Sequence, residues 1–314
     1  MHRYYRLKDY LKDRFGGDMH RVTLEGGFTC PNRDGSKAVG GCTFCTDDGS
    51  SSGARDPAHT IAVQLADGIA KQGKRFGVNK FIAYLQSFTN TYADVDYLKM
   101  IYDQAVSDER VKVLAVGSRP DCVPEEVIDL LESYTKRGLE IWIDIGVQSS
   151  HDRTLELINR AHSFADFKDA VNRIKARNNP RLRVCTHVIL GLPGETKKMI
   201  LETAERLALE EIDDIKIHQL CIFKGTPMEI DYLNSEISVM ERDEYIETLA
   251  EFIARIPKHV VIQRLMGEGK RGELIAPDWA DHGMKQKFLD KFHQYLEERN
   301  IYQGMLTQNV SGKA

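Results

Sequence analysis

The stretch Glu140-Ile-Trp-Ile-Asp-Ile-Gly-Val-Gln148 alternates aliphatic residues with polar, aromatic or small ones. Side chains of a β-strand point to alternate faces, so this alternation predicts one strand with two unlike faces. One face carries Ile141, Ile143, Ile145 and Val147, and the other carries Trp142, Asp144, Gly146 and Gln148. The aliphatic face is expected to pack on helices, which leaves Asp144 and Gln148 pointing into an interior.

Short apolar runs and amphipathic stretches alternate along most of the chain on both sides of this strand. The predicted strands are His20–Glu25, Lys80–Gln86, Val111–Gly117, Glu140–Gln148, Leu182–Gly191, Asp214–Cys221 and Val260–Arg264. The predicted helices are Thr60–Lys74, Val95–Ser107, Pro124–Lys136, His151–Asn159, Ser163–Arg177, Lys197–Glu210, Val239–Ile256 and Gly283–Glu298. This alternation predicts the α/β class, with a parallel sheet that forms a partial or full (β/α) barrel.

The length of 314 residues and the hydrophobic content of 42% suit one barrel-sized domain or two smaller ones. We expect a barrel with an N-terminal cap over residues 1–266 and a C-terminal extension over 267–314. The extension has one amphipathic helix, whose Met284, Phe288, Phe292 and Tyr295 predict docking on the barrel, and then a flexible tail.

The net charge of -4 does not indicate a nucleic-acid or membrane partner for the chain as a whole. No apolar run approaches the roughly 20 residues that span a bilayer, and the first residues have no apolar signal segment. We therefore expect a soluble, cytoplasmic protein that does not enter a membrane. The sequence does not predict an oligomeric state.

Two further predicted strands send polar side chains to the same interior as Asp144. The alternation places His187 and Gly191 inward on one, and Lys216 and His218 inward on the other. A purely structural barrel fills this space with branched apolar side chains, so the lumen is predicted to be functional. Asp144, His187, Lys216 and His218 are the candidates for substrate contact or proton transfer. A satisfied core imidazole is the alternative for each histidine, whereas a buried Lys216 needs a partner, for which Asp144 is suitable.

Three of the six cysteines, Cys30, Cys42 and Cys45, lie close together in a loop rich in Gly, Ser and Asp. A cysteine cluster without a disulfide framework indicates a metal or redox site. Three thiolates hold a [4Fe-4S] cluster and leave one iron open to another molecule. A structural zinc with His20 or His59 as fourth ligand is the alternative, and the cysteine spacing alone does not decide between them.

From about Met19 to Met266 the sequence resembles the radical S-adenosylmethionine (SAM) superfamily, in its elongator-like branch and the YhcC/YtqA-like subgroup. The eleven and two residues between the cysteines are similar to the wide first gap of that branch. The resemblance implies a [4Fe-4S] cluster on Cys30, Cys42 and Cys45, with Phe44 packing beside it. It also implies reductive cleavage of SAM to a 5′-deoxyadenosyl radical, with a reductant such as flavodoxin or ferredoxin.

Further motifs carry the resemblance along the predicted strand ends and imply residues that contact SAM. Gly117-Ser118-Arg119-Pro120-Asp121 resembles a segment that holds the SAM ribose, so Ser118 or Arg119 takes this role where relatives often have a carboxylate. Gln148 and Arg160 resemble a glutamine–arginine pair that contacts SAM, although a cation at a helix end is the alternative for Arg160. Gly191 resembles a glycine that faces adenine, and Gln86 stands where relatives grip the SAM amino group.

The subgroup resemblance implies a substrate, namely a tRNA wobble uridine whose 5-carboxymethylaminomethyl group is shortened toward 5-aminomethyl. A basic stretch gives modest support, because it could follow RNA phosphates, although a solvated helix face is the commoner explanation. Its residues are Lys168, Arg173, Lys175, Arg177, Arg181 and Arg183, with Lys197, Lys198, Lys270 and Arg271 further on. The alternatives are radical SAM chemistry on a small metabolite or protein residue, and a zinc-stabilised RNA-binding protein without catalysis.

Overall fold

A curled sheet of seven parallel strands forms the centre of the computed structural model, which describes residues 2–49, 59–269 and 272–307. The strands follow the order of the chain: β1 (His20–Leu24), β2 (Phe81–Leu85), β3 (Val111–Ser118), β4 (Glu140–Gln148), β5 (Leu182–Leu190), β6 (Asp214–Gln219) and β8 (Val261–Arg264). The edge strands β1 and β8 do not pair with each other, so the sheet is a half-barrel. The prediction of a parallel partial barrel is confirmed.

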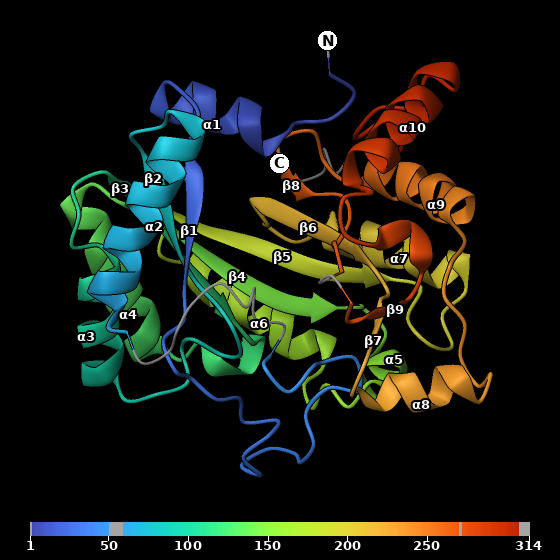
Figure 1. The fold of residues 1–314 in the computed structure, drawn as a ribbon, viewed down its shortest axis with the longest axis horizontal. Helices are drawn as coiled ribbons and strands as arrows, with labels where there is room; N and C mark the ends of the chain where they lie inside the picture. Colours follow the sequence, from blue (N-terminus) through green and yellow to red (C-terminus); the bar gives the residue numbers. More distant parts are fainter. Residues whose placement is uncertain (1, 50–58, 270–271, 308–314) are drawn as a thin grey trace.

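Helices cover the convex face of the sheet, as Figure 1 shows. They are α2 (Ile61–Phe76), α3 (Val95–Ala105), α4 (Glu125–Ser133), α6 (Phe164–Lys175), α7 (Lys197–Leu207), α9 (Arg242–Arg255) and α10 (Lys285–Glu298). Helix α5 (Asp152–Leu157) follows β4 and packs in a separate small apolar cluster. Local sequence explains where several begin, because Thr60, Ser163 and Thr196 accept hydrogen bonds from backbone N–H groups of the first turn. All eight predicted helices are present, with ends shifted by one or more residues.

The two faces of β4 have the neighbours that the alternation predicted. Its four aliphatic residues belong to the large core between sheet and helices. Trp142, on the other face, belongs to a smaller apolar cluster inside the half-barrel, with Ile82, Val113 and Val261. The same alternation directs Ile215 and Ile217 of β6 outward. The interior is therefore lined by one face of each strand, as in other barrels.

Four elements were not predicted: α1 (Leu7–Phe15), α8 (Pro227–Leu233), and the small antiparallel pair β7 (Ile222–Phe223) and β9 (Leu274–Ala276). Helix α1 lies across one end of the sheet, where Tyr10 and Leu11 pack against the inner apolar cluster (Figure 1). The backbone of Arg6 also forms a bridge with Ile262 of β8. Helix α1 thus closes the end of the lumen from which the strands start.

The C-terminal helix α10 docks on the barrel as expected. Phe288 stacks on Trp279 with ring centroids 5.8 Å apart, and Phe292 and Leu296 are fully buried. The side chain of Gln303 accepts a hydrogen bond from the Tyr5 N–H and donates one to the Val260 carbonyl, at 2.8 Å each. The division at residues 266/267 stays a prediction, and the predicted tail at 308–314 lies outside the described residues. No helix in the described part of the chain is both long and apolar enough to cross a membrane.

Glu140, at the start of β4, organises the closed end of the lumen. Its carboxylate accepts hydrogen bonds from Tyr10 at 2.5 Å, Trp142 at 2.7 Å and Arg14 at 2.9 Å. Arg183 lies 3.7 Å away and also pairs with Asp214 at 2.8 Å. Tyr10, Trp142, Arg14 and Arg183 thus converge on Glu140 and Asp214, and we interpret this layer of the lumen as structural.

We expect Glu140→Ala to lower the free energy of unfolding by about 3–5 kcal/mol, because it leaves the buried Arg183 and Tyr10 without their shared acceptor. Chemical denaturation followed by circular dichroism measures the change. Glu126→Ala, an exposed change on α4, is the matched control and should stay within about 0.5 kcal/mol of the wild type. Equal stability of the two variants would contradict a structural role for Glu140.

Candidate active site

The cysteine loop follows β1, so it lies at the carboxyl ends of the parallel strands. It docks on the segment between α5 and α6. The Thr43 N–H donates to the Ile158 carbonyl at 3.1 Å, and Asn159 Nδ2 donates to the carbonyls of Val39 at 3.0 Å and Gly41 at 2.8 Å. These bonds hold the loop against the end of β4, where barrel enzymes carry their chemistry.

Two side chains donate hydrogen bonds to the sulfur of Cys42. Arg160 NH1 lies 3.3 Å and Asn32 Nδ2 lies 3.5 Å from Cys42 Sγ. Asn32 also donates to the Asn159 carbonyl at 2.5 Å. Within the described residues, Arg160 Nε and Asn32 Oδ1 are buried without a partner. Buried polar groups of this kind are normally satisfied, so these atoms indicate a bound group beside Cys42.

Phe44 packs into a small apolar cluster with Ile158, Leu192 and Met228. The backbone N–H of Met228, in α8, donates to the Thr43 carbonyl at 3.2 Å. Helix α8 therefore supports the cysteine loop from outside. The expected contact of Phe44 with the cluster stays a prediction.

Gln148 and Arg160, twelve residues apart, meet above Gly146. A Cβ at Gly146 would lie 2.6 Å from Gln148 Nε2 and 2.7 Å from Arg160 NH2. Arg160 NH2 donates to the Gly146 carbonyl at 2.7 Å, and Gln148 adopts a φ of 69°, in the left-handed region. Only glycine leaves room for both side chains there, so the two groups are held together at the rim of the lumen.

Arg119 is buried and its guanidinium is fully engaged. It donates two hydrogen bonds to the carboxylate of Asp121, at 2.9 and 3.0 Å. It also donates to the backbone carbonyls of Arg160 at 2.9 Å and Ala161 at 3.1 Å. It therefore positions the segment that carries Arg160, and its predicted contact with SAM stays a prediction. Ser118 Oγ lies 2.6 Å from Thr91 Oγ1 at the end of β3.

The remaining expected SAM contacts lie at strand ends on the same side of the sheet. Gln86 directly follows β2, at the carboxyl end of the strand. Gly191 follows β5 with a φ of 86°, and Met240 covers it, because a Cβ there would lie 3.2 Å from Met240 Cγ. The structure thus brings the expected SAM contacts to one rim and leaves their roles as predictions.

Below this rim, Lys216 and Asp144 form a buried ion pair across the lumen. Lys216 Nζ also donates to Tyr84 Oη at 3.3 Å and lies 4.5 Å from the centre of that ring. His187 Nε2 lies 3.3 Å from Asp144 Oδ2 without the alignment of a hydrogen bond. The rings of His187 and His218 stack with centroids 5.8 Å apart. All four predicted lumen residues are therefore neighbours.

The charges of this group follow from burial and from one another. Burial lowers the pKa of His187 to about 4, with Lys216 adding to the effect, and it lowers the pKa of His218 well below its usual value. Burial also lowers the pKa of Lys216, which Asp144 opposes. Burial would raise the pKa of Asp144, but Lys216 and His187 outweigh it and hold that pKa well below its usual range. Both imidazoles are thus neutral at pH 7, next to an ion pair.

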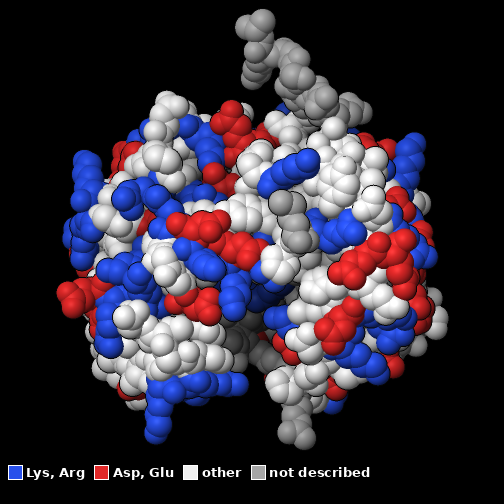
Figure 2. Space-filling view, turned by 90° about the horizontal axis from the view of Figure 1, so that it is seen from above, with Lys and Arg blue, Asp and Glu red and all other residues white. Residues whose placement is uncertain are grey.

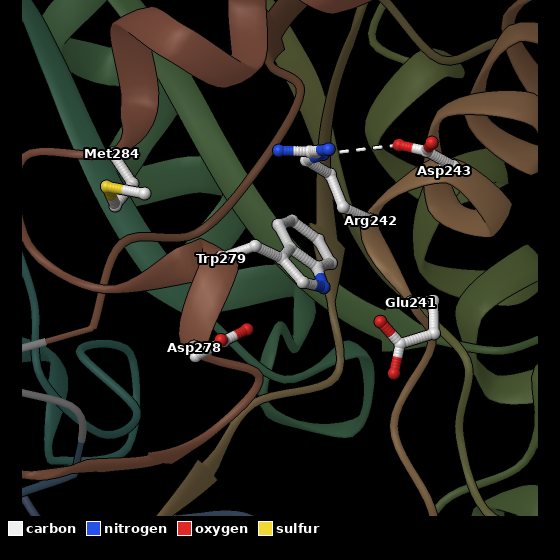
Figure 3. A pocket seen from close by; sticks show the side chains of 6 residues that line it. All are labelled: Glu241, Arg242, Asp243, Asp278, Trp279 and Met284. Atoms are coloured by element: carbon white, nitrogen blue, oxygen red, sulfur yellow. Dashed lines mark hydrogen bonds and ion pairs between the residues drawn. The ribbon is translucent and has the colours of Figure 1, made fainter.

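A surface pocket of about 360 Å³ lies between the start of α9 and the turn before α10. Figure 3 shows its lining by Trp279, Met284 and acidic and basic side chains, with Arg242 and Asp243 paired at 3.2 Å. None of the predicted site residues lines it. Its contribution is structural, because Trp279 Nε1 donates to the carbonyl of Met240 at 3.0 Å, which fixes the residue that covers Gly191.

Two protein-family models match the sequence of this chain. A model of the radical SAM superfamily matches residues 30–207, and a model of the Radical_SAM C-terminal domain matches residues 212–298. The chain belongs to the radical SAM superfamily. It is 36% identical over 308 residues to YtqA of Bacillus subtilis, an alignment that covers 98% of this chain and 94% of YtqA. Radical SAM proteins bind a [4Fe-4S] cluster and SAM, so this chain is an enzyme of that kind.

Two more distant similarities concern the elongator-like branch. The structure of Elp3 from Methanocaldococcus infernus superposes with a TM-score of 0.68 at 17% identity, over 91% of this chain and 64% of Elp3. This likeness shows the shared fold. A tRNA uridine(34) acetyltransferase of Methanocaldococcus jannaschii is 25% identical over 200 residues, which is 58% of this chain and 35% of that protein.

The family match favours a cluster over zinc. Three thiolates on one zinc lie about 3.8 Å apart, given Zn–S bonds of about 2.3 Å in a tetrahedron. Among the described residues, the three loop sulfurs do not all lie within 4.8 Å of one another. His20 stacks on Phe76 at the opposite end of β1, with centroids 3.8 Å apart. In this radical SAM enzyme, Cys30, Cys42 and Cys45 would hold the [4Fe-4S] cluster.

Sequence reasoning missed several residues that shape the site. Asn32 donates a hydrogen bond to Cys42, and Tyr84 accepts one from Lys216. Met240 packs against the backbone at Gly191. Tyr84 was detectable, because the alternation along β2 places it on the lumen face with Ile82. Asn32 and Met240 lie outside the strands, where no periodicity marks them.

We expect Gly146→Ala to weaken SAM binding about ten- to a hundredfold, because the added methyl displaces Gln148 and Arg160 and removes charge-assisted hydrogen bonds. Anaerobic equilibrium dialysis with the reconstituted enzyme measures the affinity, and iron content reports the cluster. Gly17→Ala, with open space around its Cβ and an ordinary φ, is the control. Unchanged affinity in Gly146→Ala would contradict the assignment of this rim to SAM.

We expect Arg160→Lys to lower the cluster reduction potential. A hydrogen bond to a ligand sulfur stabilises the more negative, reduced cluster, and losing one worth about 1.4 kcal/mol shifts a one-electron potential by about 59 mV. A redox titration followed by electron paramagnetic resonance, without SAM, measures this change. Arg153→Lys, on the exposed face of α5, should leave the potential unchanged. Equal potentials in both variants would exclude the bond to Cys42.

Proposed function

We propose that this radical SAM enzyme modifies the wobble uridine of tRNA and shortens a 5-carboxymethylaminomethyl group toward 5-aminomethyl. The observation that carries the proposal is similarity to a tRNA uridine(34) acetyltransferase over 58% of this chain, together with an elongator-type fold. The polar lumen also supports it, because such a substrate needs a site for a base and its charged substituent. A reductant such as flavodoxin or ferredoxin would supply the electron.

In this proposal, residues at the rim bind the cluster and SAM, and residues of the lumen bind the substrate. Cys30, Cys42 and Cys45 hold the cluster, while the Arg160 guanidinium is placed to bind the SAM carboxylate and Gln148 lies beside it. When bound, the cluster and SAM supply the radical that abstracts a hydrogen atom from the substrate. Asp144 and Lys216 fix the polar floor of the lumen below that point, with His187 in the same row of the sheet as Lys216 and His218 stacked beside His187.

The surface gives little support for the idea that RNA phosphates bind along the basic stretch. Seven of its cations in the described residues pair with carboxylates: Lys168 with Glu210, Arg173 with Asp169, Lys175 with Asp213, Arg177 with Glu125, Arg183 with Asp214, Lys197 with Glu247, and Lys198 with Glu202. Figure 2 shows basic and acidic side chains interspersed on one face, with a hollow near its centre. Lys270 and Arg271 lie outside the described residues. Recognition is therefore centred on the lumen rather than on these helices.

The proposal is tested with enzyme reconstituted anaerobically with iron and sulfide, then reduced in the presence of SAM. We expect 5′-deoxyadenosine to form, and more of it with tRNA that carries the 5-carboxymethylaminomethyl group, whose nucleoside should lose its carboxymethyl group by mass spectrometry. Cys45→Ala should abolish both signals, because the cluster loses a ligand. Cys122→Ala, which removes a cysteine outside the loop, should retain them.

Two results would contradict parts of this proposal. Formation of 5′-deoxyadenosine with an intact wobble nucleoside would exclude the tRNA substrate and favour a small metabolite or a protein residue. No 5′-deoxyadenosine from a fully reconstituted enzyme would exclude SAM cleavage itself.

A further inference from the structure

Positive charge exceeds negative charge in the upper lumen. The Glu140 layer is balanced, because Arg14 and Arg183 pair with Glu140 and Asp214. Above it, Asp144 is the carboxylate that neutralises Lys216. Arg264, at the end of β8, has no hydrogen bond or ion pair in the described part of the chain, and Arg21 donates only to the amide oxygen of Gln263, at 2.6 Å. The Arg264 guanidinium therefore remains without a carboxylate in the upper lumen, while Arg21, in register with Glu140, is linked through Gln263 to Asp214.

The register of the strands places Arg264 in the group of candidate lumen residues. Arg264 is the Cα partner of Lys216, and Lys216 is the Cα partner of His187. Burial lowers the pKa of Arg264, and the charge of Arg21 lowers it further, while Tyr84 and Asp144 oppose the shift. The side chain keeps partial solvent access, and its charge acts on His218 and Asp144. We call the part of the lumen lined by Arg264, Lys216, His187 and His218 the recess.

Polar atoms without partners lie in the same recess. Asp144 Oδ1, His187 Nε2 and His218 Nε2 are buried, and the described residues offer none of them a hydrogen bond. A buried cation and buried imidazole N–H groups without partners each cost free energy, so an occupant that accepts from both is favoured, whereas Asp144 Oδ1 is itself an acceptor and requires a donor. An anionic group provides acceptors for Arg264 and for an imidazole N–H.

We propose that Arg264 anchors a carboxylate group of the substrate in this recess, with Arg21 adding its charge and His218 a hydrogen bond. This inference rests on the proposed function only in placing the substrate in the lumen. A guanidinium binds a carboxylate through two parallel hydrogen bonds, which gives orientation as well as affinity. The anchored group lies below the rim, so the carbon next to it faces the candidate SAM site.

A metal ion is a less suitable occupant. Asp144, Cys185 and His187 offer ligand atoms within 4.8 Å of one another, but the Lys216 ammonium already occupies Asp144 Oδ2. Burial raises the pKa of the Cys185 thiol well above its usual value, so this sulfur is protonated and a poor ligand. A phosphate of the RNA backbone is also less suitable, because Arg264 is in register with the buried Lys216 on the inner face of the sheet rather than on the outer surface.

The test uses anaerobic titration calorimetry with the reconstituted enzyme and SAM, without reductant. The probes are N-benzylglycine and its neutral amide, which differ only in the carboxylate. We expect the acid to bind at least about tenfold more tightly, and Arg264→Gln to abolish that difference, since a lost charged hydrogen bond is worth about a factor of ten or more. Arg264→Lys should retain part of it. Arg75→Gln, exposed at the end of α2, is the control and should match the wild type.

Thermal unfolding and iron content establish that each variant is folded and loaded. Equal affinity of the wild type for acid and amide would overturn the proposal, as would a preference that survives in Arg264→Gln. Competition by inorganic phosphate that exceeds competition by acetate at equal ionic strength would also overturn it. A preference for the acid that depends on Arg264, without any effect of the enzyme on wobble uridine, would uphold the anchor and reject the tRNA substrate.

Discussion

The guanidinium of Arg160 is the interaction on which the candidate site depends. It joins the cysteine loop to the sheet, because one nitrogen donates to Cys42 Sγ and another to the Gly146 carbonyl. Its own segment is held from below by Arg119, which Asp121 fixes in turn. A chain of buried, charge-assisted hydrogen bonds thus runs from the end of β3 to a predicted cluster ligand. Such chains hold a geometry that single bonds do not, because each member restricts the rotamers of the next.

The lumen has two layers with different electrostatic character. In the lower layer, Glu140, Arg183 and Asp214 satisfy one another, and α1 shields them from solvent. The upper layer keeps unpaired atoms on Asp144, His187 and His218 and a cation without a counterion. Unsatisfied buried groups destabilise a fold, so they persist where a ligand satisfies them. The groups of the lower layer therefore stabilise the barrel, whereas we assign those of the upper layer to substrate binding.

The sequence predicted what depends on local periodicity. The alternation in β4 identified both faces correctly. The inward positions predicted for Lys216 and Asp144 correspond to their buried ion pair, and His187 lies beside it. Partners across long sequence separations were not predictable in the same way. The basic stretch looked available for RNA, but its cations pair with carboxylates on other elements, such as Arg177 with Glu125. Arg119 carried a family motif, yet its contacts with the Arg160 and Ala161 carbonyls emerge only from the folded chain.

Glycine at position 146 links these observations. The residue lies in the same row of the sheet as His187, Lys216 and Arg264, and it is the member without a side chain. A larger residue there would collide with Gln148 and Arg160, which belong to the rim above. The row therefore begins with the cations Lys216 on β6 and Arg264 on β8. It ends on β4 at Gly146, which has no side chain and lies next to the Arg160 guanidinium. A substrate anchored at the Arg264 end extends along this row toward the rim, so the electrostatics of the lumen determine which of its atoms faces SAM.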